Sequence, residues 1–181
     1  MEEKFRNLPL RNGVGIFLIN KHNKVFVAKR IDNPKNFWQM PQGGVDEGED
    51  LLTAAYRELK EETSISNVKL IKEIDSTLTY ELPDNLLGII WKGKYKGQKQ
   101  KWFLMRYLGE DEDINIKTTN PEFLEWKWVD IDKITEIVVD FKLNVYKELK
   151  EKVKKIISSV ILKFQLFDQL NISTHHLSPS Y

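Results

Sequence analysis

The chain has 181 residues, the size of one domain, and its hydrophobic share of 41% and charged share of 30% are typical of a soluble globular protein. No run approaches the ~18 apolar residues that span a bilayer, and the charged N-terminus lacks the apolar core of a secretory signal. The chain has no cysteine, which excludes disulfides, thiolate catalysis and cysteine-ligated zinc. We therefore expect a cytoplasmic protein without a membrane partner, in which any metal is a hard cation held by carboxylates.

The net charge of +1 hides an uneven distribution along the chain. Residues 46–62 hold seven acidic and two basic side chains, a net charge of −5, whereas the remainder of the chain carries +6. An acidic segment within a mildly basic body suits a divalent-metal site that receives a polyanion. A solvated acidic helix face would give the same pattern, so charge alone does not decide between the two.

The first third of the chain predicts a β-hairpin, a sharp bend and a helix. Apolar runs at residues 13–19 and 24–28 flank a short polar turn, which is the pattern of a hairpin. The run at 37–40 ends in Pro-Gln-Gly-Gly at 41–44, where the backbone must bend sharply. From about residue 50 to 63 the apolar residues recur at helical spacing.

The rest of the chain predicts further strands and one long helix. Strand-like runs cover residues 68–74, 77–82, 88–91, 102–108 and 125–129. Steps of three or four predict a helix with the apolar stripe Phe141, Val145, Leu149, Val153, Ile156 and Val160. The expected fold class is α/β (α+β), an α/β/α sandwich with a mixed sheet. We expect one domain over residues 1–165 and a C-terminal tail over 166–181.

The helix predicted at 50–63 carries the residues that could do chemistry. At about 100° per residue, Glu58, Glu61 and Glu62 fall within an arc of roughly 100° on one face. Three carboxylates this close repel each other, and Mg²⁺, which prefers oxygen ligands, would offset the repulsion. The residues alone leave open both a metal site and a plain charged helix.

Two neighbouring features support the metal interpretation. Arg57 stands four residues before Glu61, where it can orient a carboxylate. Gly43 and Gly44 allow the preceding loop to approach a metal closely, so that a backbone carbonyl could ligate it.

This segment resembles the motif of the Nudix hydrolases, G-x5-E-x7-R-E-U-x-E-E-x-G-U, in which U is an aliphatic residue. The matching residues are Gly43, Glu49, Arg57, Glu58, Leu59, Glu61, Glu62 and Ile65. One position departs from the motif, because Ser64 stands where the family has its last glycine. That glycine normally ends the helix in a left-handed turn, which serine tolerates poorly, so the departure concerns the end of the helix rather than the chemistry.

The resemblance extends over nearly all of residues 8–155. It is carried by the segments FWQMPQGG at 37–44, GQKQKWF at 97–103, PEF at 121–123 with Trp126 and Trp128, and VVDFK at 138–142. These segments resemble the bacterial RNA pyrophosphohydrolase branch of the family, which is shared with diadenosine-tetraphosphate hydrolases. The resemblance implies a Nudix sandwich with the motif helix at its centre.

The resemblance also implies a metal-dependent hydrolysis. Two or three Mg²⁺ or Mn²⁺ ions would be held by Glu58, Glu61, Glu62, Glu122 and the carbonyl of Gly43. A water activated by the metals, and deprotonated by Glu58 or Glu61, would attack phosphorus without a covalent intermediate. Glu49 would be a structural residue outside the set of metal ligands.

Substrate-binding residues follow from the same resemblance. The positions matching phosphate-binding residues of the branch are Arg11, Arg30, Gln42, Gln98, Lys99 and Lys101. Phe141 matches an aromatic residue that stacks on a base near the 5′ end of RNA, although its place in the apolar stripe leaves core packing open. We expect Trp38, Trp102, Trp126 and Trp128 to be core residues, and we assign no role to His22, His175 or His176.

Three functions remain open at this point. The resemblance favours removal of pyrophosphate from the 5′-triphosphate end of RNA, or of phosphate from a 5′-diphosphate end, which would initiate mRNA decay. Asymmetric hydrolysis of dinucleoside polyphosphates would use the same metals and the same nucleophile. The third function is a non-catalytic RNA- or nucleotide-binding module, which the complete set of Arg57, Glu58, Glu61 and Glu62 argues against. The sequence does not indicate an oligomeric state.

Overall fold

A computed structural model describes residues 5, 7–32, 35 and 37–174, with side chains described as far as Val160 and for Leu162. Its centre is a seven-stranded sheet in the order β3-β2-β1-β6-β5, with β4 paired to β1 and β7 paired to β2. The strands are β1 Leu10–Ile19, β2 Val25–Arg30, β3 Trp38–Gln39, β4 Gln42–Gly44, β5 Val68–Glu81, β6 Gly97–Tyr107 and β7 Phe123–Val129.

The sheet is mixed, as the sequence predicts. The pair β1–β6 is parallel along its whole length, from Leu10 opposite Gly97 to Ile19 opposite Arg106. All the other pairings are antiparallel, including the predicted hairpin of β1 and β2. The parallel pair brings the start of β6 beside the start of β1, and β4 pairs with the same part of β1.

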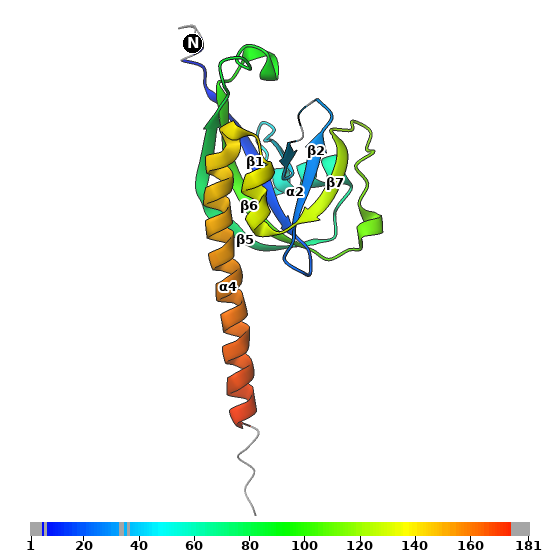
Figure 1. Cartoon of the computed structure of the whole chain (residues 1–181), viewed down its shortest axis with the longest axis vertical. Helices are drawn as coiled ribbons and strands as arrows, with labels where there is room; N and C mark the ends of the chain where they lie inside the picture. The colour runs from blue at the N-terminus through cyan, green and yellow to red at the C-terminus, as the bar shows by residue number, and fades with distance from the viewer. Residues whose placement is uncertain (1–4, 6, 33–34, 36, 175–181) are drawn as a thin grey trace, which may run out of the picture.

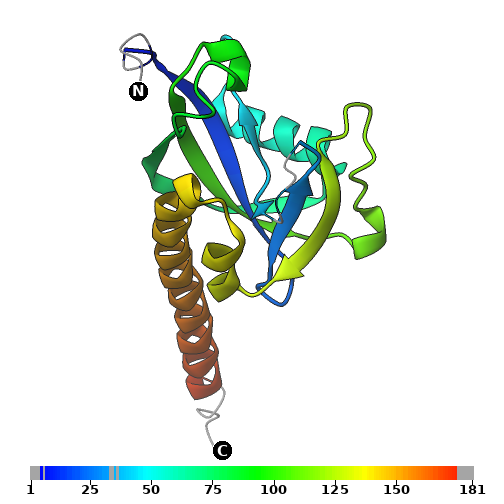
Figure 2. The same ribbon diagram turned by 45° about the horizontal axis from the view of Figure 1, so that its top comes forward.

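Two helices cover opposite faces of this sheet (Figures 1 and 2). Helix α2, Leu51–Thr63, buries Ala54, Ala55 and Leu59 in one core cluster. Helix α4, Leu143–Thr174, buries part of its predicted stripe in the other cluster. The α/β/α sandwich is therefore confirmed. Shorter helical segments are η1 Ile90–Gly93, η2 Asp111–Asp113, η3 Ile131–Lys133, α3 Ile134–Ile137 and η4 Asp140–Lys142.

Helix α4 extends well beyond the globular body in Figure 1. Val153 is fully buried, and Ile156 and Ile157 pack against the core, but Val160 and Leu162 are exposed. The helix continues through Thr174, past the boundary at residue 165, and His175 and His176 lie outside the described residues. Among the described residues, no helix is both long enough and apolar enough to cross a membrane.

Three predicted segments differ in the structure. The strand expected at 88–91 is wrong, because the chain turns there through η1, in which Trp91 and Lys92 have φ of 52° and 57°. Left-handed backbone angles break the extended conformation in spite of the apolar run. The strands expected at 68–74 and 77–82 form one strand, β5, with an irregularity between Glu73 and Thr77. The bend expected at 41–44 contains the short strand β4.

Candidate metal and phosphate site

Helix α2 is capped at both ends, which fixes the positions of its carboxylates. At the N-terminus, Asp50 Oδ2 accepts hydrogen bonds from the Thr53 backbone N–H at 2.9 Å and the Thr53 hydroxyl at 3.0 Å. At the C-terminus, Ser64 has φ 61° and donates its N–H to the Lys60 carbonyl at 2.8 Å. The Ser64 hydroxyl donates to the Asn115 carbonyl at 3.1 Å. The left-handed turn expected of the motif glycine is thus kept by serine.

The three predicted carboxylates of α2 differ in their exposure. Glu62 is only 3% exposed, and its Oε2 accepts a hydrogen bond from the Gln42 backbone N–H at 3.1 Å. Its Oε1 is buried and has no hydrogen-bond partner among the described residues. The Glu58 side chain is largely buried, whereas the Glu61 side chain is mostly exposed. The helix therefore presents one acid fully inside, one at the boundary and one outside.

Arg57 connects the loop before α2 to the carboxylates of the helix. Its guanidinium donates to both oxygens of Glu49, at 2.8 and 2.7 Å, and to the Gly44 carbonyl at 3.0 Å. Its Nη1 also donates to Glu58 at 2.9 Å and to Glu61 at 3.3 Å. These hydrogen bonds lower the pKa of Glu49 to about 2. Arg57 therefore orients Glu58 and Glu61, and Glu49 orients Arg57.

The glycine pair of β4 lies directly against these groups. A side-chain carbon at position 43 would collide with the carboxylate of Glu58, and one at position 44 would collide with the guanidinium of Arg11. The Gly43 carbonyl accepts a hydrogen bond from Gln98 Nε2 at 3.3 Å. Glycine at both positions therefore leaves room for these side chains, and a larger residue would displace Glu58 or Arg11.

A fourth carboxylate reaches this site from the loop before β7. Glu122 accepts a hydrogen bond from Arg30 Nη1 at 2.8 Å, and its backbone carbonyl accepts the N–H of Ile31 at 2.9 Å. Arg30 also makes a two-point contact with the carboxylate of Asp32, at 2.7 and 2.8 Å. The chain thus brings Glu122 near Glu62, although 60 positions separate them in the sequence.

The electrostatics of these acids fit a divalent cation. Burial raises the pKa of Glu62 well above its ordinary value, and the nearby charges of Glu122 and Glu58 raise it further. Burial likewise raises the pKa of Glu58. Acids that repel each other, one of them with an unpartnered buried oxygen, are the donor set that Mg²⁺ or Mn²⁺ would stabilise.

The carboxylates do not converge as a finished coordination shell. Within the described part of the chain, no three acidic or histidine side chains stand in a metal-binding arrangement. The reason is visible in the hydrogen bonds, since Arg57 holds Glu58 and Arg30 holds Glu122.

The predicted substrate residues lie in different environments. Gln98 is buried, and its Oε1 accepts the hydroxyl proton of Tyr80 at 2.9 Å. Gln42 is partly buried in β4, and its Oε1 has no hydrogen-bond partner among the described residues. Lys99 is exposed, whereas Lys101 forms an ion pair with Glu73 at 2.7 Å. Of these four, Gln98 and Gln42 adjoin the carboxylates, and Lys101 is engaged elsewhere.

Sequence reasoning missed a buried lysine beside this site. Lys142, in η4, is 6% exposed, and its Nζ donates to Gln39 Oε1 at 3.1 Å, 103 positions away. The ammonium lies 5.2 Å from the ring centroid of Tyr80. Burial and the charge of Arg30 lower the pKa of Lys142 to about 7. Nothing in the local sequence distinguishes this lysine from a solvated one.

Some of the predicted aromatic residues are buried in the core, and others are only partly buried. Trp102 is fully buried and Trp38 nearly so, as expected. Trp126 and Trp128 are partly buried, and each ring centroid lies 5.6 Å from that of Phe26. Phe141 is also partly buried, packs against the core, and lies 5.5 Å from Tyr80. It is therefore partly exposed beside Tyr80, which leaves both of its predicted roles open.

Comparison with known proteins identifies the family of this chain. The sequence model of the NUDIX domain matches residues 9–149. The RNA pyrophosphohydrolase of Pelagibacter ubique is 72% identical over 158 residues, which cover 87% of this chain and 100% of that protein. That of Rhodospirillum rubrum is 51% identical over 142 residues, covering 78% and 86%. The chain therefore belongs to the Nudix family. It is an enzyme of that family, a Nudix pyrophosphohydrolase.

Solved structures support the same fold. The Escherichia coli dihydroneopterin triphosphate pyrophosphohydrolase is similar with a TM-score of 0.62 and 24% identity, over 77% of this chain and 96% of that chain. An Ap4A hydrolase of C. elegans, in a binary complex, has a TM-score of 0.56 and 21% identity, over 82% and 98%. At these identities the likeness concerns the fold alone.

Proposed function

We propose that this Nudix enzyme removes pyrophosphate from the 5′-triphosphate end of RNA, or phosphate from a 5′-diphosphate end, and so initiates mRNA decay. The observation that carries the proposal is a cluster of opposite charges, in which the buried acid Glu62 lies near Glu58 and Glu122 and near the cations Arg30 and Lys142. Such a cluster can hold metal ions and a polyphosphate together. The names of the relatives that are 72% and 51% identical support RNA as the substrate.

In this proposal Glu58, Glu61, Glu62, Glu122 and the Gly43 carbonyl hold two or three divalent cations. Bound there, Mg²⁺ or Mn²⁺ supplies charge neutralisation for the phosphates and makes a water molecule more acidic. The unpartnered Glu62 Oε1 supports its assignment as a ligand, because a buried carboxylate oxygen without a partner is costly.

The protein's own groups orient the attack. Glu58 or Glu61 accepts the proton of the attacking water, the water oxygen bonds to phosphorus, and the bond to the leaving phosphate oxygen breaks. Arg57 touches both candidate bases, so it keeps their carboxylates in position for this transfer. Its contacts to Glu49 and to the Gly44 carbonyl hold it against the loop throughout.

Basic and aromatic groups near the carboxylates bind the substrate in this proposal. Arg11, Arg30 and Lys99 contact phosphates as cations, and Lys101 does so in exchange for its ion pair with Glu73. Gln42 and Gln98 contribute amide groups beside Gly43. Arg30 suits a phosphate because its guanidinium already binds the carboxylate of Asp32 at two points, and a phosphate offers the same geometry. Phe141, which is partly exposed beside Tyr80, stacks on a base near the 5′ end.

Product analysis tests the proposal directly. The purified chain is incubated with Mg²⁺ and, in parallel, with 5′-triphosphorylated RNA, 5′-diphosphorylated RNA and diadenosine tetraphosphate, and the released phosphates are separated. We expect 5′-monophosphorylated RNA as the main product and slower cleavage of the dinucleotide. Faster cleavage of diadenosine tetraphosphate would favour the dinucleoside polyphosphate hydrolase instead. Absence of turnover on all three substrates would favour a binding module.

A further inference from the structure

The connection between β5 and β6 has an unusual backbone that the proposed function leaves unexplained. Trp91 and Lys92 are consecutive non-glycine residues in the left-handed region, with Gly88 and Gly93 also at positive φ on either side. L-residues rarely adopt this conformation, and it persists where the surroundings hold it in place. We call residues 88–96 the basic loop.

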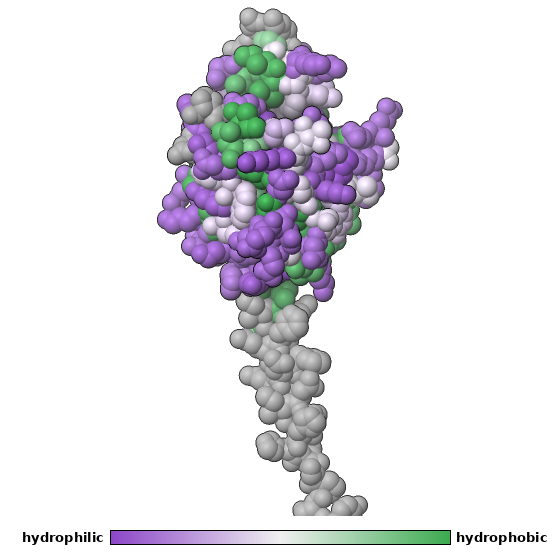
Figure 3. All heavy atoms as spheres, turned by 90° about the vertical axis from the view of Figure 1, so that its right-hand side faces the viewer, coloured by the Kyte–Doolittle hydropathy of each residue, from purple (hydrophilic) through white to green (hydrophobic). Residues whose placement is uncertain are grey.

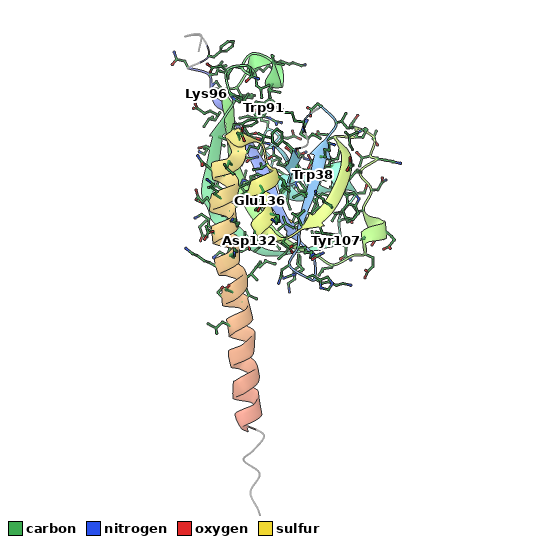
Figure 4. The ribbon with its side chains drawn as sticks, viewed as in Figure 1. Trp38, Trp91, Lys96, Tyr107, Asp132 and Glu136 are labelled. Carbon is green, nitrogen blue, oxygen red and sulfur yellow. The ribbon has the colours of Figure 1, made fainter. Side chains whose placement is uncertain are left out.

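Aromatic contacts hold the basic loop in this conformation. The Arg11 guanidinium lies over the Trp91 ring at 5.6 Å from its centroid. The Tyr95 ring meets Trp91 edge to face, with the centroids 6.2 Å apart. In Figure 4, Trp91 and Lys96 lie together at the upper end of the molecule. The loop is therefore a shaped surface that displays aromatic rings.

The charge of this surface is strongly positive. No acidic residue occurs between positions 85 and 109, and lysines stand at 92, 94, 96 and 99. Lys96 pairs with Glu81 at 2.9 Å. Lys92, Lys94 and Lys99 are exposed and form no ion pair with any residue that the structure describes. The exposed lysines leave their positive charge available to an anionic partner.

The same surface also exposes apolar groups. Ile89 is 68% exposed, and Trp91 and Tyr95 are partly exposed. Figure 3 shows apolar patches near the upper end of the face it displays, bordered by hydrophilic side chains. Cationic and aromatic side chains on one loop are the combination that binds single-stranded nucleic acid, with lysines at the phosphates and rings stacked on bases.

The basic loop is continuous with the carboxylate site. Arg11 touches Trp91 on one side and lies against Gly44 on the other. The Gly44 carbonyl accepts a hydrogen bond from Arg57, which in turn holds Glu58. Trp91 and Phe141 also pack against the same core cluster. A strand whose 5′ end lies at the carboxylates can therefore continue across Arg11 to the loop.

We propose that the basic loop binds the RNA strand that follows the 5′-terminal nucleotides, with Lys92 and Lys94 at phosphates and Trp91 stacked on a base. This inference rests on the proposed function, because the strand is that of an RNA whose 5′ end is the substrate. It makes RNA length, rather than the 5′ end alone, a determinant of affinity.

Binding of a 5′-hydroxyl RNA 12-mer tests the loop without any dependence on turnover. The double variant Lys92→Gln/Lys94→Gln is compared with the wild type and with Lys21→Gln/Lys69→Gln, which removes two exposed charges from the β1–β2 turn and from the start of β5. We expect about tenfold weaker binding for the loop variant only. The slope of log affinity against log salt should fall by about 1.4, since each phosphate contact on a single strand contributes roughly 0.7.

Hydrolysis of two substrates of different length completes the test. The loop variant should lose about tenfold in kcat/KM on a 5′-triphosphorylated 12-mer and less than twofold on a 5′-triphosphorylated dinucleotide. Trp91→Leu should show the same dependence on length, with a melting temperature reported beside it. Equal losses on both lengths, or loop and control variants that bind the 12-mer alike, would overturn the inference while the proposed function stands. Normal binding of the 12-mer without hydrolysis of any 5′-triphosphate would instead defeat the proposed function.

Discussion

Helices α2 and α4 cover opposite faces of the sheet, yet each side delivers a buried charge to the same short stretch of chain. From α2, Glu62 accepts the N–H of Gln42, and from η4 just before α4, Lys142 donates to Gln39. The acid has a raised pKa and the base a lowered one, both because of burial. Charges buried in this way disfavour folding, which is consistent with the binding role proposed for this part of the molecule.

The two helices differ in how their positions are used. Helix α2 is short and capped at both ends. Along one side it carries Arg57, Glu58, Glu61 and Glu62. Helix α4 is long and packs by an apolar stripe whose core contacts, among the described side chains, end near Ile157. Substitutions in α2 should therefore change activity more than stability, while substitutions around α4 should separate substrate binding from packing.

The largest expected effect is the loss of a carboxylate from α2. Glu58→Gln, Glu61→Gln and Glu62→Gln should each lower turnover with Mg²⁺ by orders of magnitude while the fold remains intact, because glutamine keeps the shape and loses the charge. In EDTA, Glu62→Gln should melt at or above the wild-type temperature, since it removes a buried charge. Turnover near that of the wild type in two of the three variants would defeat the metal-site interpretation.

The second-largest expected effect is the loss of the Phe141 ring, which lies in η4 just before α4. Phe141→Ala should lower kcat/KM on 5′-triphosphorylated RNA by roughly ten- to hundredfold, because stacking on one base is worth about 1–3 kcal/mol. Hydrolysis of diadenosine tetraphosphate should change much less. If both substrates lose activity in the same proportion and the melting temperature falls, Phe141 is a core residue only.

The buried lysine gives a dependence of stability on pH. The folded-state pKa of Lys142 is about 7, well below that of an exposed lysine, so the unfolded chain binds more protons above pH 7. Below pH 7 the buried ammonium is charged, and it lowers the free energy of unfolding by its full amount. This effect disappears as the pH rises toward 10. Lys142→Met, melted in EDTA, should gain more over the wild type at pH 6 than at pH 9.5. The loss of the lysine's packing contacts changes the melting temperature by the same amount at both pH values. An equal difference between variant and wild type at pH 6 and pH 9.5 would therefore contradict the prediction.

The sequence predicts local elements and the motif well, because both depend on nearby residues. Periodicity predicts α2, the start of α4 and the β1–β2 hairpin, and spacing alone places Glu58, Glu61 and Glu62 on one helix face. The strand expected at 88–91 fails because an apolar run does not reveal a left-handed backbone. Apolar residues there pack against the core from a turn.

The buried polar contacts of Glu62 and Lys142 could not be predicted from sequence, because they join distant segments. Lys142 and Gln39 are 103 positions apart, and a lysine after an apolar run has the pattern of a surface residue. Arg30 was expected to contact phosphate, but only the fold shows that Asp32 and Glu122 already share its guanidinium. The resemblance to the Nudix family predicts Glu122 as a site residue, whereas the local sequence does not.

A smaller effect tests the end of α2. Ser64 has φ 61°, so Ser64→Gly should raise the free energy of unfolding by up to about 1 kcal/mol and leave activity almost unchanged. The gain is limited because the serine hydroxyl donates to the Asn115 carbonyl, a hydrogen bond that glycine cannot make. Urea denaturation measures the change, and a clear loss of stability would show that this hydrogen bond outweighs the backbone strain.

The smallest effect is expected at the far end of α4. We propose that residues 1–165 form the domain and that 166–181 are a tail. Among the side chains that the structure describes, core contacts of the stripe end near Ile157, and the helix ribbon then runs free of the sheet in Figure 1. The Pelagibacter ubique relative is matched over its whole length by 87% of this chain. A chain truncated after Gln165 should therefore unfold within about 0.5 kcal/mol of the full chain, as a surface change away from the core does. Its kcat/KM on 5′-triphosphorylated RNA should be unchanged within twofold.

The control is truncation after Glu151, which removes Val153 from the core and should lower the melting temperature sharply. Equal destabilisation by both truncations would show that the end of α4 belongs to the domain.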